Sequence, residues 1–237
     1  MSVIWHDIEC GAYGADRALW RSLASERPGP LLDVGAGTGR IALDLARRGH
    51  RVVALDRDPE LLSELAARAG GLEVETVVAD AREFKLDTSF GLIIVPMQTI
   101  QLLGGAEGRR RFLERARRHL RPGGLLGVAI SEHLELYETE TGPGAPLPDI
   151  RELDGVVYSS QPTAVREDPR GFVLERLRET VGGDGVRTVE QDSIRIDALT
   201  ADQLEREATE VGLRPAGRTE IPPTPDHVGS VVVMLRG

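Results

Sequence analysis

The chain has 237 residues, which is long enough for one α/β domain with an elaboration and short for two domains of ordinary size. Its 29 basic and 38 acidic residues give a formal charge of −9, which argues against binding to a phosphate backbone. A single cysteine, Cys10, excludes an internal disulfide framework, and no run of about 18 apolar residues predicts a membrane helix. The first residues lack the basic and apolar regions of a signal peptide. We therefore expect a cytoplasmic protein with no nucleic-acid or membrane partner.

The first expected element is a helix over residues 12–26. Tyr13, Leu19, Trp20 and Leu23 have the apolar spacing of a helix face, and Arg-Pro-Gly-Pro at 27–30 ends it. Because this helix precedes the first strand of the predicted sheet, we expect it to fold over the ligand edge of that sheet.

Residues 31–40 read Leu-Leu-Asp-Val-Gly-Ala-Gly-Thr-Gly-Arg. An apolar strand stops here at an acid and then meets three alternate glycines, which let the backbone turn sharply and approach a ligand. A helix over 40–48 follows, and a second strand over 51–55 ends in Asp56, where βαβ units hold ribose hydroxyls. The pattern predicts a loop for an adenosine-containing ligand; the alternative is a glycine turn that only connects a strand to a helix.

The glycine spacing separates two classes of ligand. Dinucleotide sites use G-x-G-x-x-G, whereas the third glycine here is Gly39 and the next residue is Arg40. Asp33 at the mouth of the loop would repel a pyrophosphate and attract a ligand with ammonium and sulfonium charges. S-adenosylmethionine is such a ligand, and an acid followed by G-x-G-x-G resembles the first motif of the class I S-adenosylmethionine-dependent methyltransferases.

The next part of the chain repeats the strand and helix pattern of a doubly wound parallel sheet. The segment 82–89, between the third and fourth strands, is too short for a crossover helix. The expected elements are helices over 58–69 and 107–120, and strands over 74–78, 91–95 and 125–130.

The pattern changes after the fifth strand. Residues 131–152 are predicted to form an acidic loop, and alternating stretches with turn residues between them indicate antiparallel strands. These strands are expected over 155–160, 165–168, 172–180 and 185–196, followed by a helix over 200–211 and a hairpin of 214–221 with 228–235.

The resemblance extends over essentially the whole chain and implies its fold and organisation. We expect an α/β fold with a doubly wound, seven-stranded, mostly parallel sheet, Rossmann-like with the last strand antiparallel, and a small antiparallel β lid inserted after strand five. Residues 1–237 would form a single domain, with 12–26 over the cofactor and 131–197 as the acceptor-binding lid. The lid and the N-terminal helix are similar to those of bacterial glycine and sugar N-methyltransferases.

The resemblance also implies which residues hold S-adenosylmethionine, with S-adenosylhomocysteine as the product. Asp33 would meet the methionine ammonium, Asp56 both ribose hydroxyls, and Asp80 the adenine amine. The alternative for Asp56 and Asp80 is ordinary capping of the next helix, and for Tyr13 a buried aromatic on a helix face. The full expected set is Tyr13, Asp33, Gly35, Ala36, Gly37, Asp56, Arg57, Asp80, Ala81, Pro96 and Gln98.

Methyl transfer by in-line displacement needs alignment and a dry site, and a general base only when the acceptor arrives protonated. His133, just after the fifth strand, is a candidate base, and Gln98 is a candidate for positioning the acceptor. The alternatives are a solvent-facing histidine and a capping or surface glutamine. Met97, Gln101 and Glu132 are further residues near these strand ends. We assign no role to His6, His50, His119 and His227.

The sequence argues against several methyl acceptors. The segment Val-Pro-Met-Gln-Thr after the fourth strand differs from the Asn/Asp-Pro-Pro-aromatic motif of enzymes that methylate amino groups of nucleic acids, and no residue cluster has convincing metal spacing. We expect a small-molecule acceptor, an amine above all, with no metal, in a monomer or a homodimer. The N-terminal amine of a peptide, a non-catalytic cofactor-binding protein and an NAD-linked oxidoreductase remain alternatives.

Overall fold

The computed structural model describes residues 2–139, 146–224 and 227–237. These residues form two compact units. The core unit holds the described parts of residues 1–3, 13–132 and 199–237, and the second unit holds those of 4–12 and 133–198.

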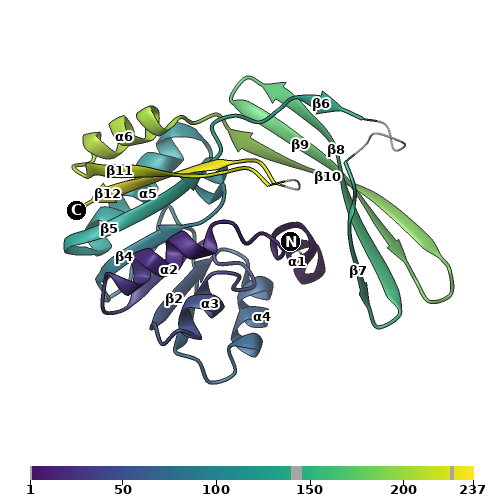
Figure 1. Ribbon diagram of the computed structural model, residues 1–237, viewed down its shortest axis with the longest axis horizontal. Helices are drawn as coiled ribbons and strands as arrows, with labels where there is room; N and C mark the ends of the chain where they lie inside the picture. Colours follow the sequence, from purple (N-terminus) through teal and green to yellow (C-terminus); the bar gives the residue numbers. More distant parts are fainter. Residues whose placement is uncertain (1, 140–145, 225–226) are drawn as a thin grey trace. The chain divides into compact units, whose positions relative to one another are not determined.

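The core unit is built on a seven-stranded sheet in the order β11-β12-β5-β4-β1-β2-β3 (Figure 1). The strands from β5 to β3 are parallel, and β12 runs antiparallel to both β5 and β11. This arrangement confirms the predicted Rossmann-like sheet with an antiparallel last strand. The strands are β1 (Leu31–Val34), β2 (Val52–Asp56), β3 (Val74–Val78), β4 (Phe90–Val95), β5 (Leu120–Ile130), β11 (Arg214–Ile221) and β12 (Ser230–Arg236).

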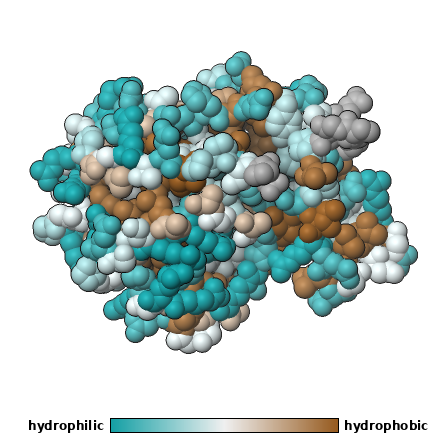
Figure 2. All heavy atoms as spheres, viewed as in Figure 1, coloured by the Kyte–Doolittle hydropathy of each residue, from teal (hydrophilic) through white to brown (hydrophobic). Residues whose placement is uncertain are grey.

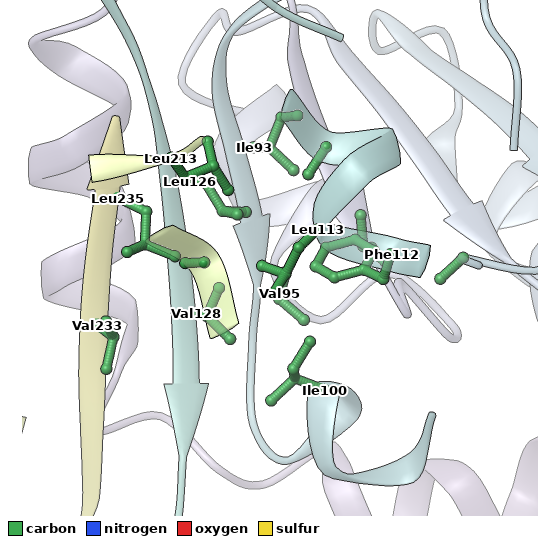
Figure 3. Close-up of a cluster of buried hydrophobic side chains, with 14 of the residues drawn as sticks. Ile93, Val95, Ile100, Phe112, Leu113, Leu126, Val128, Leu213, Val233 and Leu235 are labelled. Carbon is green, nitrogen blue, oxygen red and sulfur yellow. The ribbon is translucent and has the colours of Figure 1, made fainter. Parts of the chain in front are cut away.

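Helices cover both faces of this sheet, because the central strands are apolar on both faces. On one face lie α5 (Gly105–His119), α6 (Ala201–Glu210) and the 3₁₀ helix η1 (Thr99–Leu102), and Figure 3 shows Phe112 and Leu113 of α5 beside Val95 of β4. The opposite face is covered by α2 (Arg17–Ser25), α3 (Ala42–Ala46) and α4 (Pro59–Ala69). Trp20 of α2 is fully buried there.

Several element boundaries differ from the prediction. Helix α3 is shorter than the predicted helix over 40–48, because the glycine loop continues as turn past Gly39, whose φ is +95°. Strand β5 begins at Leu120, immediately after α5, rather than at 125. No helix lies between β3 and β4, as the short segment 82–89 predicts.

The second unit contains an antiparallel sheet in the order β10-β9-β8-β6, with β7 paired to β8. This sheet confirms the antiparallel insertion after strand five. The predicted acidic loop over 131–152 is partly wrong: its ends pair with β8 as β6 and β7, which satisfies backbone groups that a loop would leave to water. Residues 140–145 of that loop lie outside the described residues. The strands are β6 (Tyr137–Glu138), β7 (Asp149–Leu153), β8 (Val156–Asp168), β9 (Gly171–Val181) and β10 (Arg187–Asp197).

The N-terminal helix α1 (Val3–Cys10) is an element that the sequence analysis missed. Glu9 accepts hydrogen bonds from Arg178 Nε at 2.7 Å and from Ser160 Oγ at 2.8 Å, and both charged side chains of this ion pair are buried. The Trp5 ring meets the Tyr158 ring edge-on, with centroids 5.6 Å apart. Helix α1 therefore belongs to the second unit through both ionic and aromatic contacts.

The second unit also exposes hydrophobic side chains at its surface, some of which are visible as brown residues in Figure 2. Among the described residues of the whole chain, no helix is long and apolar enough to cross a membrane. The large exposed hydrophobics of the second unit are Leu136, Leu147, Ile150, Leu153, Val157, Val186 and Val189.

Candidate functional site

The candidate site lies at the edge of the core sheet where the parallel strands β1, β2, β3, β4 and β5 end. Open α/β sheets bind their ligands at this edge. Strand β12 is antiparallel, and Val231 near its start pairs with Ile130 at the end of β5. The loop that precedes β12 therefore meets the same edge as the ends of the parallel strands.

The glycine loop after β1 is held against the end of β2. The backbone N–H groups of Gly35 and Ala36 both donate to the carbonyl oxygen of Leu55, at 2.8 and 3.0 Å. Gly35 has φ +74°, and a Cβ there would lie 2.5 Å from Thr99 Cγ2. Glycine is thus required at Gly35 both by its backbone conformation and by the close approach of η1.

Asp56 at the end of β2 shapes this loop with its side chain. Its Oδ2 accepts from the Gly37 backbone N–H at 2.9 Å, and its Oδ1 accepts from the Asp58 backbone N–H at 3.0 Å. A carboxylate offers about four acceptor positions, so two partners leave room for the hydroxyls of a ligand. The two alternatives for Asp56, a local structural contact and a ligand contact, are therefore compatible.

Asp33 is the most unusual polar group of the site. Its side chain is 1% exposed, it receives a backbone hydrogen bond from Ala42, and its Oδ1 has no hydrogen-bond partner among the described residues. Burial raises the pKa of Asp33 to about 7, against the opposing effect of the Arg40 charge. A buried carboxyl oxygen without a hydrogen-bond partner costs free energy of folding unless a ligand supplies that partner. A cationic group is the strongest partner for an ionised carboxylate.

Asp80, which follows β3, is already paired within the chain. Arg82 donates to both of its oxygens, including an Nη2–Oδ2 bond of 2.5 Å, and this pairing lowers the pKa of Asp80 to about 2. Asp80 therefore stays ionised at neutral pH, and both of its oxygens act as hydrogen-bond acceptors. Ala81 beside it is buried, and Arg57 after β2 is exposed.

Arg40, which stands where a dinucleotide motif has its third glycine, holds the N-terminal segment onto the glycine loop. Its two Nη atoms donate to the two oxygens of Asp16 at 2.6 and 2.7 Å, and Nη1 also donates to the carbonyl oxygen of Tyr13. Both side chains of the ion pair are buried, and Trp20 Nε1 donates to Asp16 as well. The arginine that replaces the third glycine of the dinucleotide pattern thus has a structural role.

Tyr13 lies in the same cluster. Its ring is within 5.1 Å of the Arg40 guanidinium carbon and 4.9 Å from the His227 ring, measured to centroids, and its hydroxyl is hydrogen-bonded to the Ser230 side chain. Burial raises the pKa of Tyr13 above its ordinary value, so it is a neutral phenol at neutral pH.

The loop after β4 connects to the end of β5. Gln98 Nε2 donates to Ser131 Oγ at 2.9 Å, and Gln101 exchanges two hydrogen bonds with the Ser131 backbone. Met97, between Pro96 and Gln98, has a left-handed φ of +55°, which is unusual outside glycine. Such backbone strain is concentrated at functional sites, so this loop belongs to the candidate site.

Two further candidate residues follow the end of β5. Glu132 Oε1 accepts from the Ala201 backbone N–H at 2.6 Å, so it caps the N-terminus of α6. His133 is exposed and is the first residue of the second unit's main segment. Within the described residues, no group of three or more His, Cys, Asp or Glu side chains is arranged to hold a metal ion.

His227 is a site residue that sequence reasoning missed. It lies in the loop before β12, which is far from the glycine motif in sequence but reaches the same sheet edge because β12 pairs with β5. Only the strand order of the folded sheet brings it to Tyr13; a pattern of hydrophobic residues has no signal for this.

Residues 31–124, from the start of β1 into β5, match the family described as a methyltransferase domain. This segment, which is less than half of the chain, is similar to a methyltransferase domain. The motifs of the chain resemble those of the class I S-adenosylmethionine-dependent methyltransferases. One curated relative is the cypemycin N-terminal methyltransferase of a Streptomyces species, which is 34% identical over 114 residues. That alignment covers 47% of this chain and 46% of the relative. The chain spans about half the length, or less, of the first curated relatives it matches.

Solved methyltransferase structures share the fold over nearly the whole chain. One is an amino pentose methyltransferase from Micromonospora echinaspora with S-adenosylmethionine bound, with a TM-score of 0.71, 18% identity, and 99% and 97% of the two chains covered. Another is a glycopeptide N-methyltransferase in complex with S-adenosylhomocysteine, with a TM-score of 0.62, 24% identity, and 95% and 88% covered. At these identities the similarity concerns the fold alone.

Proposed function

We propose that this protein is an S-adenosylmethionine-dependent methyltransferase that acts on an amine. The observation that carries the proposal is Asp33, a buried carboxyl with an unpartnered oxygen at the start of a glycine loop. An ammonium group is the partner that such an oxygen lacks, and S-adenosylmethionine has one on its methionine part. The residues present therefore fit this cofactor.

The chain's own residues would divide the binding between them. Asp33 would hold the ammonium, Asp56 the ribose hydroxyls, and Asp80 with Ala81 the adenine, while Gly35, Ala36 and Gly37 would lie against the methionine and the ribose. Tyr13, Pro96 and Gln98 would border the methionine end, and Arg57 the adenine. When bound, the cofactor supplies a methyl group activated by its sulfonium.

An amine acceptor is supported by what related proteins are named for. The structural neighbours include sugar and glycopeptide N-methyltransferases, and the cypemycin relative acts at an N-terminus by its name. The last observation favours the N-terminal amine of a peptide as the second candidate, beside the amino group of a small molecule. We propose that the second unit contributes to recognition of the acceptor.

Calorimetry with S-adenosylmethionine and S-adenosylhomocysteine tests the cofactor part. We expect binding of both, and Asp56→Ala should weaken it by about 1–3 kcal/mol through the lost hydroxyl contacts. Tight binding of NADH with indifference to S-adenosylmethionine would refute the proposal in favour of an oxidoreductase.

Mass spectrometry of a panel of acceptors tests the reaction. The panel should hold amino sugars, small alkylamines and short peptides with free and acetylated N-termini. Addition of one methyl group to an amine supports the proposal. If a peptide is methylated with a free N-terminus and not with an acetylated one, the methylated atom is the N-terminal amine. Cofactor binding without any product over the whole panel would indicate a non-catalytic cofactor-binding protein.

A further inference from the structure

His227 is a half-buried histidine at the ligand edge of the core sheet, and the proposed function leaves it without a role. Two backbone hydrogen bonds join His227 to Thr224: the Thr224 N–H donates to the His227 carbonyl oxygen at 2.9 Å, and the His227 N–H donates to the Thr224 carbonyl oxygen at 3.4 Å. Two residues later, the Gly229 carbonyl oxygen accepts from Ser131 Oγ at 3.4 Å. The loop is thereby fixed to the end of β5 and, through Ser131, to Gln98.

The two ring nitrogens of His227 have different surroundings. Nδ1 lies 3.5 Å from Thr224 Oγ1, whereas no hydrogen-bond partner of Nε2 is found among the described residues. One face of the imidazole meets the Tyr13 ring, with the two planes inclined by 37°. The ring is therefore held in place by its contacts while Nε2 is available to a ligand.

Of the titratable side chains around the Tyr13–His227 ring pair, His227 is the one suited to accept a proton. The titratable or charged groups around the ring pair are Tyr13, Arg40 and Asp16, and Arg40 and Asp16 neutralise each other in a buried ion pair. Tyr13 is a phenol whose pKa is raised by burial, so it does not accept a proton at neutral pH. An imidazole is the side chain that both binds and releases a proton in this range.

We propose that His227 is the general base of the reaction and that the acceptor is a basic amine, which arrives as an ammonium ion. This inference rests on the proposed function and deepens it. Nε2 takes one proton from the ammonium group, which frees the nitrogen lone pair. The lone pair forms the new N–C bond while the S–C bond breaks with its electron pair remaining on sulfur. The charge passes to the methylated ammonium, and His227 releases its proton to water.

His227→Phe is the sharpest variant, because it keeps an aromatic ring against Tyr13 and removes Nε2. At pH 7, with an alkylamine that the wild-type protein methylates, we expect kcat to fall about 100-fold, the scale of general base catalysis. Near pH 10, where alkylamines lose their proton in water, the defect should shrink to about 3-fold. The dissociation constant for S-adenosylhomocysteine should stay within about 2-fold of wild type, which reports an intact cofactor site.

Two further variants complete the design. His50→Gln, a histidine between α3 and β2 at the opposite edge of the sheet, is the matched control and should leave kcat unchanged. His133→Gln tests the histidine that the sequence offers as a candidate base. A pH-independent defect in His227→Phe, a defect that is absent, or a loss that appears in His133→Gln instead would overturn the proposal. If the wild-type protein methylates no amine at all, the proposed function itself has failed, which is a different result.

Discussion

At the scale of single residues, Asp33 carries a stability cost beside the cofactor-binding role proposed for it. The folded protein binds the Asp33 proton more tightly than the unfolded chain does, because burial raises the pKa of this carboxyl from its ordinary 3.8 to about 7. The folded state therefore holds an extra proton between about pH 4 and pH 7. It follows that the free energy of unfolding of the cofactor-free protein falls as pH rises through this window.

Asp33→Asn removes the titratable group with little change of shape. At pH 8 we expect the cofactor-free variant to be more stable than wild type by up to about 4 kcal/mol, from about three pH units at about 1.4 kcal/mol each. At pH 4.5 the difference should be only about 1 kcal/mol, because most of this pH window lies above that pH. Urea unfolding at both pH values measures the difference, and a variant that is less stable at pH 8 would contradict the argument.

The same substitution should weaken binding of the cofactor. Because an ammonium pairs with the ionised carboxylate, wild-type affinity for S-adenosylhomocysteine is expected to rise with pH through about 7, and this rise should vanish in Asp33→Asn. Asp44→Asn is the control, since the pKa of Asp44 is lowered by Arg21 and the residue lies on α3, away from the loop. Its effect should be on stability alone.

At the scale of elements, two Arg–Asp pairs join the N-terminal segment to the glycine loop and the helix that follows it. Arg40–Asp16 is buried, with side chains 6% and 1% exposed, whereas Arg21–Asp44 is at the surface with 36% and 18%. Both pairs have two short hydrogen bonds. Both pairs are therefore bidentate. They differ in solvation, and the buried pair is further supported by hydrogen bonds from Arg40 to the Tyr13 carbonyl oxygen and from Trp20 to Asp16.

We expect Arg40→Met to cost about 3–5 kcal/mol of unfolding free energy, because it leaves the Asp16 carboxylate buried without its cation. Arg21→Met should cost at most about 1 kcal/mol, as exposed pairs do. Denaturant unfolding of both variants at the same pH measures the contrast. Equal effects would mean that burial does not set the strength of these pairs.

The elements of the core unit were largely predictable, and the reason is local. The apolar runs that end in Val34, Asp56 and Val95, and the breaks at the glycines between them, fix strands and turns without help from distant residues. Helix α1 and the edge strands β6 and β7 were missed because they are short and are stabilised by their neighbours in the second unit. No sequence window of their length contains those neighbours.

At the scale of the whole molecule, the chain divides into two units, and α1 is held to the second by the buried Glu9–Arg178 pair. Glu9→Gln should weaken this attachment, because Arg178 would lose its buried ion pair with Glu9, although its ion pair with Asp192 would remain. We expect faster hydrogen exchange in α1 and in β8 and β9, with unchanged exchange in α5 of the core unit.

Hydrogen exchange followed by mass spectrometry resolves these segments. Asp7→Asn is the comparison on the same helix, since Arg151, one partner of Asp7, is 45% exposed, whereas both side chains of the Glu9–Arg178 pair are buried. Uniformly faster exchange in both units of Glu9→Gln would show that the two units unfold together, contrary to the expectation.

The sequence alone determined the motif from which a cofactor site is predicted: an acid, three alternate glycines and acids at the next strand ends lie within 50 residues of one another, where local rules apply. The tertiary structure decided what each of these acids does in the fold, why position 40 is arginine, and that His227 meets Tyr13. Those facts depend on strand order and burial, since a parallel sheet with an antiparallel last strand joins residues more than 200 positions apart. Whether a buried polar group has a hydrogen-bond partner also depends on the packing of the folded chain, so it cannot be read from a local stretch of sequence.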